Sequence, residues 1–170
     1  MRLINSVPLL GLLAVIFTLY FSLNLSANPK DYITELSQLK LPLVESSTEE
    51  TLDLTKFHGQ YYILHLFASW CSMCKNDTAL LRKIAKETKA PIIGIAMRDN
   101  INKLRLINKD NLAYDYITID LDKQVGKLLN NKAIPETIII NPEGIVVFDY
   151  LGTLPESEVE EVIIPAMIEK

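Results

Sequence analysis

The sequence predicts an α/β domain, with a central mixed β-sheet flanked by helices, preceded by an N-terminal transmembrane helix. Three observations support this fold class. The first 27 residues contain a long apolar segment, residues 61–67 are a continuous run of β-prone apolar residues, and strand-like and helix-like segments alternate from there onward. Such alternation is typical of a sheet with helices on both faces.

The composition fits one globular domain behind the apolar segment. A chain of 170 residues is too short for two ordinary domains, and 49% hydrophobic with 22% charged residues exclude a disordered chain. The formal net charge of -4 gives no basic surface that would predict nucleic-acid binding. We therefore expect no nucleic-acid partner.

Residues 1–27 have the pattern of a membrane signal-anchor. No charged residue occurs from position 3 to position 27, and a helix of about 20 apolar residues crosses the hydrocarbon core of a bilayer. Arg2 precedes the run, so the positive-inside rule predicts a cytoplasmic N-terminus and a domain on the other side of the membrane. The expected topology is a single pass, with the rest of the chain outside the cytoplasm.

A cleaved signal peptide is the alternative to an anchor. Its apolar region is normally about 7–15 residues, which is shorter than the run found here, and bulky Leu25 is a poor residue for a cleavage site. An uncleaved anchor is therefore favoured. Either alternative exports the rest of the chain to a compartment in which disulfides form.

The domain is expected to begin at residue 41, after a polar tether at residues 28–40. Residues 41–44 and 51–54 are predicted to be two short extended segments around a polar turn. Residues 61–67 (YYILHLF) are predicted to be a strand buried on both faces. The N-terminal extended segments would then precede the central strand of the sheet.

The periodicity changes from strand to helix after Cys71. Leu80, Leu81 and Ile84 recur at helical spacing, which predicts a helix that ends before Pro91. The later elements are expected to be a strand at 91–97, a short helix at 102–108, a strand at 114–119, a helix around Val125, strands at 137–140 and 145–148, and an amphipathic helix from Pro155. The turn Asn-Pro-Glu-Gly at 141–144 predicts a hairpin that adds antiparallel edge strands.

The two cysteines of the chain, Cys71 and Cys74, lie where the predicted strand gives way to the predicted helix. A thiolate is the nucleophilic form of cysteine, and the unpaired N–H groups and dipole of a helix N-terminus favour the anion. Their spacing suits a two-step exchange in which Cys71 attacks a disulfide and Cys74 resolves the mixed disulfide.

Two other uses of the cysteine pair are less favoured. A structural disulfide stabilises most when it closes a long loop, and this one would close a very short loop. A zinc site needs four ligands, and His58 and His65 are the two histidines of the chain. We therefore interpret Cys71 and Cys74 as a redox-active disulfide pair, and we expect no metal and no cofactor.

Two segments resemble a known family. Residues 67–74 (FASWCSMC) resemble the strand-to-helix active site of thioredoxin-like proteins, and residues 134–137 (IPET) are similar to the segment that carries their cis-proline. With residues 138–144 and the anchor, the likeness narrows to the membrane-anchored thiol:disulfide interchange proteins of cytochrome c maturation, the DsbE/CcmG type within the TlpA-like family. The resemblance covers residues 41–170 and implies a thioredoxin-like fold and a protein-disulfide oxidoreductase.

The resemblance also implies roles for three residues around the cysteines. Pro135 would be cis and would present the backbone of Ile134 to the substrate; the alternative is an ordinary trans proline at the start of a strand. Glu136 and Asp77 match acidic positions near the cysteines, where a carboxylate disfavours the thiolate and can relay protons. For Asp77 the alternative is a solvated residue in the first helical turn.

Trp70 and His65 complete the predicted site. Trp70 is expected to shield the nucleophile and to pack against partners. His65 lies six residues before Cys71, where thioredoxins carry a buried acid; it could take up protons during exchange, or it could be a core histidine with a satisfied hydrogen bond. Residues 72–73 and 130–133 depart from the family pattern, which leaves substrate choice and redox potential open.

The resemblance implies two kinds of partner. The client would be the haem-binding cysteines of apocytochrome c or a cytochrome c maturation protein, and a membrane electron-donor thiol reductase would re-reduce this protein. One alternative is an anchored reductase of the same fold for copper-site assembly or general disulfide reduction. A different class of protein, a non-catalytic copper carrier, is another alternative, and a peroxidase is less favoured because its reactive cysteine is normally not paired at this spacing.

Overall fold

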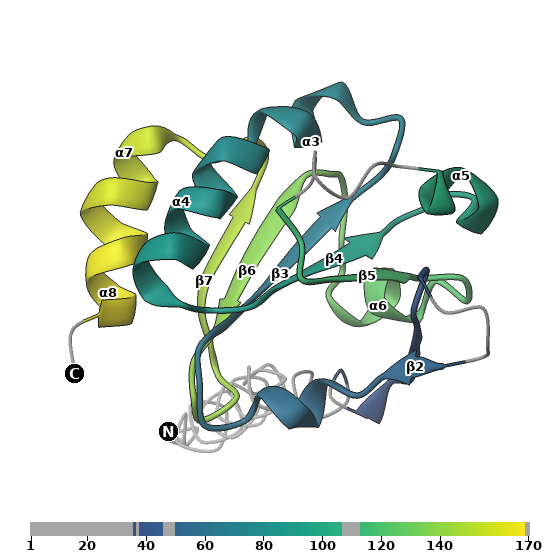
Figure 1. The fold of residues 1–170 in the computed structure, drawn as a ribbon, viewed down its shortest axis with the longest axis horizontal. Helices are drawn as coiled ribbons and strands as arrows, with labels where there is room; N and C mark the ends of the chain where they lie inside the picture. The colour runs from purple at the N-terminus through teal and green to yellow at the C-terminus, as the bar shows by residue number, and fades with distance from the viewer. Residues whose placement is uncertain (1–35, 37, 46–49, 107–112, 169–170) are drawn as a thin grey trace, which may run out of the picture.

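The computed structural model describes residues 36, 38–45, 50–106 and 113–168 (Figure 1). The predicted anchor and most of the predicted tether lie outside these residues. Among the residues that are described, no helix is both long and apolar enough to cross a membrane.

The predicted mixed sheet is confirmed, with five strands in the order β5-β4-β3-β6-β7. The strands are β3 (Tyr62–Phe67), β4 (Ile92–Ala96), β5 (Tyr116–Ile119), β6 (Glu136–Ile140) and β7 (Val146–Leu151). β3, β4 and β5 pair in parallel, whereas β6 is antiparallel to both β3 and β7. β3 is central and buried along its whole length, as the apolar run predicts.

One prediction about the sheet is wrong. The hairpin was expected to add antiparallel edge strands, but β6 lies inside the sheet between β3 and β7, so of the two hairpin strands only β7 lies at an edge. The burial patterns give the physical reason: all five residues of β6 are buried, whereas β7 alternates between half-buried and exposed residues. A strand buried on both faces belongs inside a sheet, and a strand with one solvent-exposed face can lie at its edge.

Helices cover one face of the sheet, and the N-terminal segments with one helix cover the other (Figure 1). On the first face lie α4 (Thr78–Thr88) and the C-terminal helix, which runs through α7 (Glu156–Glu158), a π-helical turn (Val159–Ile163) and α8 (Ile164–Ile168). On the second lie β1 (Leu41–Pro42), β2 (Thr51–Leu52), a 3-10 helix (Leu54–Phe57) and α6 (Gln124–Leu128). The two faces bury separate apolar clusters, one against each side of β3.

Two predicted helices differ from the expectation. The helix after Cys71 is divided into α3 (Ser72–Asn76) and α4, with Asp77 between them. The short helix expected at 102–108 is α5 (Ile101–Arg105), which begins earlier because the side chain of Asn100 accepts hydrogen bonds from the N–H groups of residues 102 and 103.

Four loops lie together at the edge of the sheet that is formed by the carboxyl ends of its parallel strands. This edge is not an edge strand such as β7. The carboxyl ends of parallel β3, β4 and β5 point the same way, and antiparallel β6 begins at that edge. The cysteine loop follows β3, Arg98 and Asp99 follow β4, Asp120 follows β5, and Pro135 precedes β6. Residues that are far apart in the sequence therefore meet around Cys71.

Gly94 opens space beneath this edge. Gly94 pairs with His65 across β3 and β4, and a Cβ atom at position 94 would lie 2.7 Å from the ring of Tyr114. No real side chain tolerates such a contact with a ring, so a glycine is needed for the ring of Tyr114 to lie over the strand beside His65.

Candidate active site

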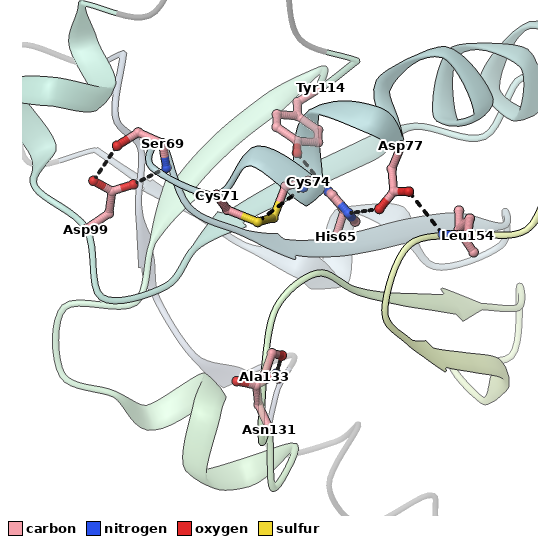
Figure 2. The surroundings of a disulfide bond; sticks show 10 residues. All are labelled: His65, Ser69, Cys71, Cys74, Asp77, Asp99, Tyr114, Asn131, Ala133 and Leu154. Carbon is pink, nitrogen blue, oxygen red and sulfur yellow. Dashed lines mark hydrogen bonds and ion pairs between the residues drawn. A yellow bond between two sulfur atoms is a disulfide. The ribbon is translucent and has the colours of Figure 1, made fainter.

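Cys71 and Cys74 form a disulfide at the start of α3, with an S–S distance of 2.07 Å (Figure 2). Cys71 is the N-cap residue of α3, and its Sγ accepts a hydrogen bond from the backbone N–H of Cys74 at 3.1 Å. Once the disulfide is reduced, the backbone N–H of Cys74 would donate a hydrogen bond to the Cys71 thiolate and favour the anion. The predicted position of Cys71 at a strand-to-helix boundary is confirmed.

Asp99 holds the loop that leads into Cys71. Its carboxylate accepts hydrogen bonds from the backbone N–H of Ser69, at 2.5 Å, and from the Ser69 hydroxyl, at 2.9 Å (Figure 2). Sequence reasoning missed Asp99. The signal that could have found it is its place directly after a buried parallel strand, at the edge where the cysteine loop lies.

Trp70, which is expected to shield the nucleophile and to pack against partners, is mostly exposed, whereas the neighbouring Cys71 is buried. Its side chain is 64% exposed, and its indole N–H donates to the carbonyl of Arg98 at 3.4 Å. Met73, also beside the cysteines, is 52% exposed, whereas both cysteines are buried. Two large apolar side chains thus frame the disulfide with surface that a protein partner could cover.

His65, Tyr114 and Asp77 form a hydrogen-bonded chain inside the protein. Nδ1 of His65 lies 2.7 Å from the Tyr114 hydroxyl, and Nε2 lies 3.3 Å from Oδ2 of Asp77. Oδ1 of Asp77 accepts the backbone N–H of Leu154 at 3.0 Å (Figure 2). Tyr114 also packs against the apolar cluster that contains both cysteines, so the chain lies next to the disulfide.

The chemistry of Tyr114, His65 and Asp77 determines which atoms carry the protons of these hydrogen bonds. Burial, and after it the charge of Asp77, raise the pKa of the Tyr114 hydroxyl, so Tyr114 keeps its proton. A carboxylate only accepts hydrogen bonds, so Nε2 of His65 donates to Asp77, and in the neutral imidazole Nδ1 then accepts the hydroxyl of Tyr114. Both ring nitrogens of His65 have hydrogen-bond partners, which favours a core histidine over a proton acceptor.

The solvated alternative for Asp77 is wrong. Asp77 is fully buried, and its carboxylate joins α4 to His65 and to the backbone before the C-terminal helix. A buried carboxylate needs such partners because its desolvation is costly. Sequence reasoning missed Tyr114, which is linked to Asp77 through His65, because nothing distinguishes this tyrosine from any other at the start of a predicted strand.

The Ile134–Pro135 peptide bond is cis, as the resemblance implies, so the trans alternative is wrong. Pro135 immediately precedes β6 and is followed by Glu136, which pairs with Leu66 of β3. Ile134 packs against the apolar cluster that contains both cysteines. The cis-proline segment and the disulfide therefore lie at the same edge of the sheet.

Glu136 lies on the opposite face of the sheet from His65. Directly paired strand residues share a face, and Glu136 pairs with Leu66, whereas His65 pairs with Thr137. The Glu136 carboxylate accepts a hydrogen bond from the side-chain amide of Asn131, at 2.5 Å, and the same amide donates to the carbonyl of Ala133. Asn131, which sequence reasoning missed, thus ties the loop before the cis-proline to Glu136.

The pKa of Glu136 is raised. Burial is the main cause and neighbouring Asp149 adds to it, while the hydrogen bond from Asn131 opposes it. A carboxyl group with a raised pKa in the folded state binds its proton more tightly there than in the unfolded chain. Its stabilising contribution is complete below the unfolded-state pKa, and it is lost as the pH rises through the folded-state pKa.

Glu136→Gln should therefore flatten part of the pH dependence of stability. We expect the free energy of unfolding of the wild type to fall more between about pH 4 and pH 8 than that of the variant, because glutamine cannot ionise but still offers Asn131 an oxygen. Urea unfolding at several pH values measures this difference. Glu143→Gln, in the exposed hairpin turn, is the matched control; equal pH dependence in Glu136→Gln and the wild type would contradict the assignment.

The comparisons with known proteins agree with this site. The AhpC/TSA family model matches residues 34–149. The probable thiol:disulfide interchange protein DsbE-2 of Pasteurella multocida is 28% identical over 163 residues, which cover 93% of this chain and 85% of that protein. The thiol:disulfide interchange protein DsbE of Allochromatium vinosum is 26% identical over 152 residues, 87% of this chain and 83% of that one.

A solved structure supports the fold independently. The structure of dsbF from Mycobacterium tuberculosis, in mixed oxidised and reduced forms, superposes with a TM-score of 0.64 at 16% identity, covering 77% of this chain and 96% of that one. The family match spans more than half of the chain, and the disulfide between Cys71 and Cys74 occupies the start of a helix after the central strand. The chain therefore belongs to the AhpC/TSA family, with a thioredoxin-like fold and the Cys-x-x-Cys pair of a thiol:disulfide oxidoreductase.

Proposed function

We propose that this protein is a membrane-anchored dithiol reductant that acts on the periplasmic side of the bacterial inner membrane during cytochrome c maturation. The observation that carries the exchange chemistry is the hydrogen bond from the Cys74 N–H to Cys71 Sγ at the start of α3. It selects Cys71 as the sulfur that is stabilised as an anion, and hence as the nucleophile. The relatives named DsbE support the assignment of the pathway.

The exchange proceeds in two balanced steps. The thiolate of Cys71 attacks one sulfur of a client disulfide, and the other client sulfur leaves as a thiolate that takes up a proton. Cys74 then loses its proton and attacks Cys71 Sγ, which releases the second client thiol and forms the intramolecular disulfide. Two electrons pass to the client, and a membrane thiol reductase must restore the dithiol.

The residues around the cysteines have supporting roles in this proposal. Pro135 shapes the segment that presents the Ile134 backbone to the client, and Trp70 offers an exposed ring to it. The hydrogen bond between His65 and Asp77 joins β3 to the point at which α3 ends and α4 begins, next to the disulfide. Glu136 fixes the cis-proline loop through Asn131.

The membrane anchor in this proposal is residues 1–27, with residues 28–40 as a tether and residues 41–170 as the catalytic domain. The uncharged run and the preceding Arg2 support it. The client would be the haem-binding cysteine pair of apocytochrome c or a maturation protein that carries it. A reductase of the same fold that serves copper sites or general disulfide reduction is the competing proposal.

Deletion of the gene from its own organism tests the proposal. We expect the deletion strain to lose most of its covalently haem-stained c-type cytochromes, the wild-type gene to restore them, and the Cys71→Ser/Cys74→Ser gene to fail. The wild-type protein should be found in the membrane fraction. Normal c-type cytochromes in the deletion strain would overturn the client assignment, and a protein found only in the soluble fraction would overturn the anchor.

A further inference from the structure

Two adjoining hollows lie beside the cysteine loop. The first is lined by Trp70 and Ile134 and has a volume of about 270 Å³; the second has a volume of about 220 Å³. Both are lined by Met97, Arg98 and Asn131, so they form one continuous depression that starts at the active site.

Four cationic side chains line this depression, which we call the cationic hollow: Arg98, Lys123, Lys127 and Lys132. All four are exposed, in a chain whose formal net charge is -4. Asp120, the carboxylate in the lining, is buried.

None of the four cations of the cationic hollow forms an ion pair with a carboxylate of the described residues. Both oxygens of Asp120 accept backbone N–H groups, those of Val125 at 3.1 Å and of Gly126 at 3.0 Å. The ion pairs His65–Asp77 and Lys83–Glu160 both lie outside the hollow. A group of uncompensated cations in a depression attracts an anionic partner.

The backbone of the cationic hollow is unusual as well. Among the described residues, four residues other than glycine have a positive φ, and two of them line the hollow: Arg98 at 51° and Lys123 at 57°. A left-handed conformation costs energy for residues with a Cβ, and such residues collect at sites that hold ligands. Arg98 and Lys123 project from this backbone into the lining.

We infer that the cationic hollow binds an acidic, extended segment of the client protein next to the client's disulfide. This inference rests on the proposed exchange function and adds a partner chemistry to it. The acidic segment would lie against Arg98 and the three lysines, and the adjoining client backbone would pass Trp70 and Ile134 to reach Cys71. Opposite charges raise the rate of productive encounter and select among partners.

The test uses the reduced protein and three synthetic peptides that share one internal disulfide and differ only in the residues flanking it, which are glutamate, glutamine or lysine. Stopped-flow Trp70 fluorescence follows oxidation of Cys71 and Cys74 at low salt and at about 0.5 M salt. Hydroxyethyl disulfide, which is uncharged, reports on exchange itself. The variants are Lys127→Gln/Lys132→Gln and, as a matched control with the same loss of charge on other helices, Lys86→Gln/Lys103→Gln.

We expect the wild type to react on the order of tenfold faster with the acidic peptide than with the glutamine peptide at low salt, and more slowly with the lysine peptide. High salt should remove most of this preference. Lys127→Gln/Lys132→Gln should lose most of it, whereas the control variant should keep it. Equal rates on the acidic and glutamine peptides, or the same preference in both variants, would overturn the inference. Failure with hydroxyethyl disulfide as well would instead overturn the exchange function.

Discussion

Cys71→Ser is expected to abolish reduction of a disulfide substrate, with a loss in kcat/KM of at least about 1000-fold, because the variant lacks the thiol that makes the first attack. Cys74→Ser is expected to carry out the first attack and then stop, since nothing resolves the mixed disulfide. The asymmetry arises from the hydrogen bond at 3.1 Å that Cys71 Sγ receives from the Cys74 backbone N–H, which the serine at position 74 also supplies. Non-reducing gels and mass spectrometry of cell extracts detect the trapped client.

The double variant Cys71→Ser/Cys74→Ser is the control for this experiment, because it should trap no client. Trapping through Cys71→Ser in place of Cys74→Ser would show that the nucleophile is Cys74 and that the roles proposed here are reversed. The identity of the trapped client also distinguishes a cytochrome c maturation pathway from general disulfide reduction.

The buried central strand and the position of Cys71 at a helix N-terminus could be predicted because both depend on the pattern of neighbouring residues in the sequence. Six consecutive apolar or aromatic positions make β3 a buried strand, and the change of period after it places Cys71 at a helix N-terminus. The cis state of Pro135 is different. It could be expected only from the resemblance to a family, since the sequence around a proline permits both isomers.

The missed features depend on contacts between distant segments. Tyr114 reaches His65 across 49 residues of sequence, and only because Gly94 leaves room for its ring. The break between α3 and α4 at Asp77 has no glycine or proline to mark it. The break coincides with the hydrogen bonds that the Asp77 carboxylate accepts from His65 and from the N–H of Leu154, which is 77 residues away. Helical spacing alone does not reveal such tertiary contacts.

Asp77→Ala is expected to destabilise the oxidised protein by about 3 kcal/mol, because it removes the acceptor of two buried donors. The carboxylate accepts from Nε2 of His65 at 3.3 Å and from the N–H of Leu154 at 3.0 Å, and both His65 and Asp77 are fully buried. Asp77→Asn keeps one oxygen acceptor and nearly the same volume, so its cost should be smaller. Urea unfolding at constant pH measures both variants.

A double-mutant cycle with His65→Leu separates this chain of bonds from simple loss of packing. If Asp77 and His65 stabilise the protein together, Asp77→Ala in a His65→Leu background should cost at least about 1 kcal/mol less than in the wild type. Asp53→Ala removes an exposed carboxylate that caps the 3-10 helix through Thr55 and should change stability less than Asp77→Ala. Full additivity of Asp77→Ala and His65→Leu would contradict the coupling. In that case the buried carboxylate would stabilise the protein mainly through its hydrogen bond with the N–H of Leu154, which joins the start of α4 to the segment before the C-terminal helix.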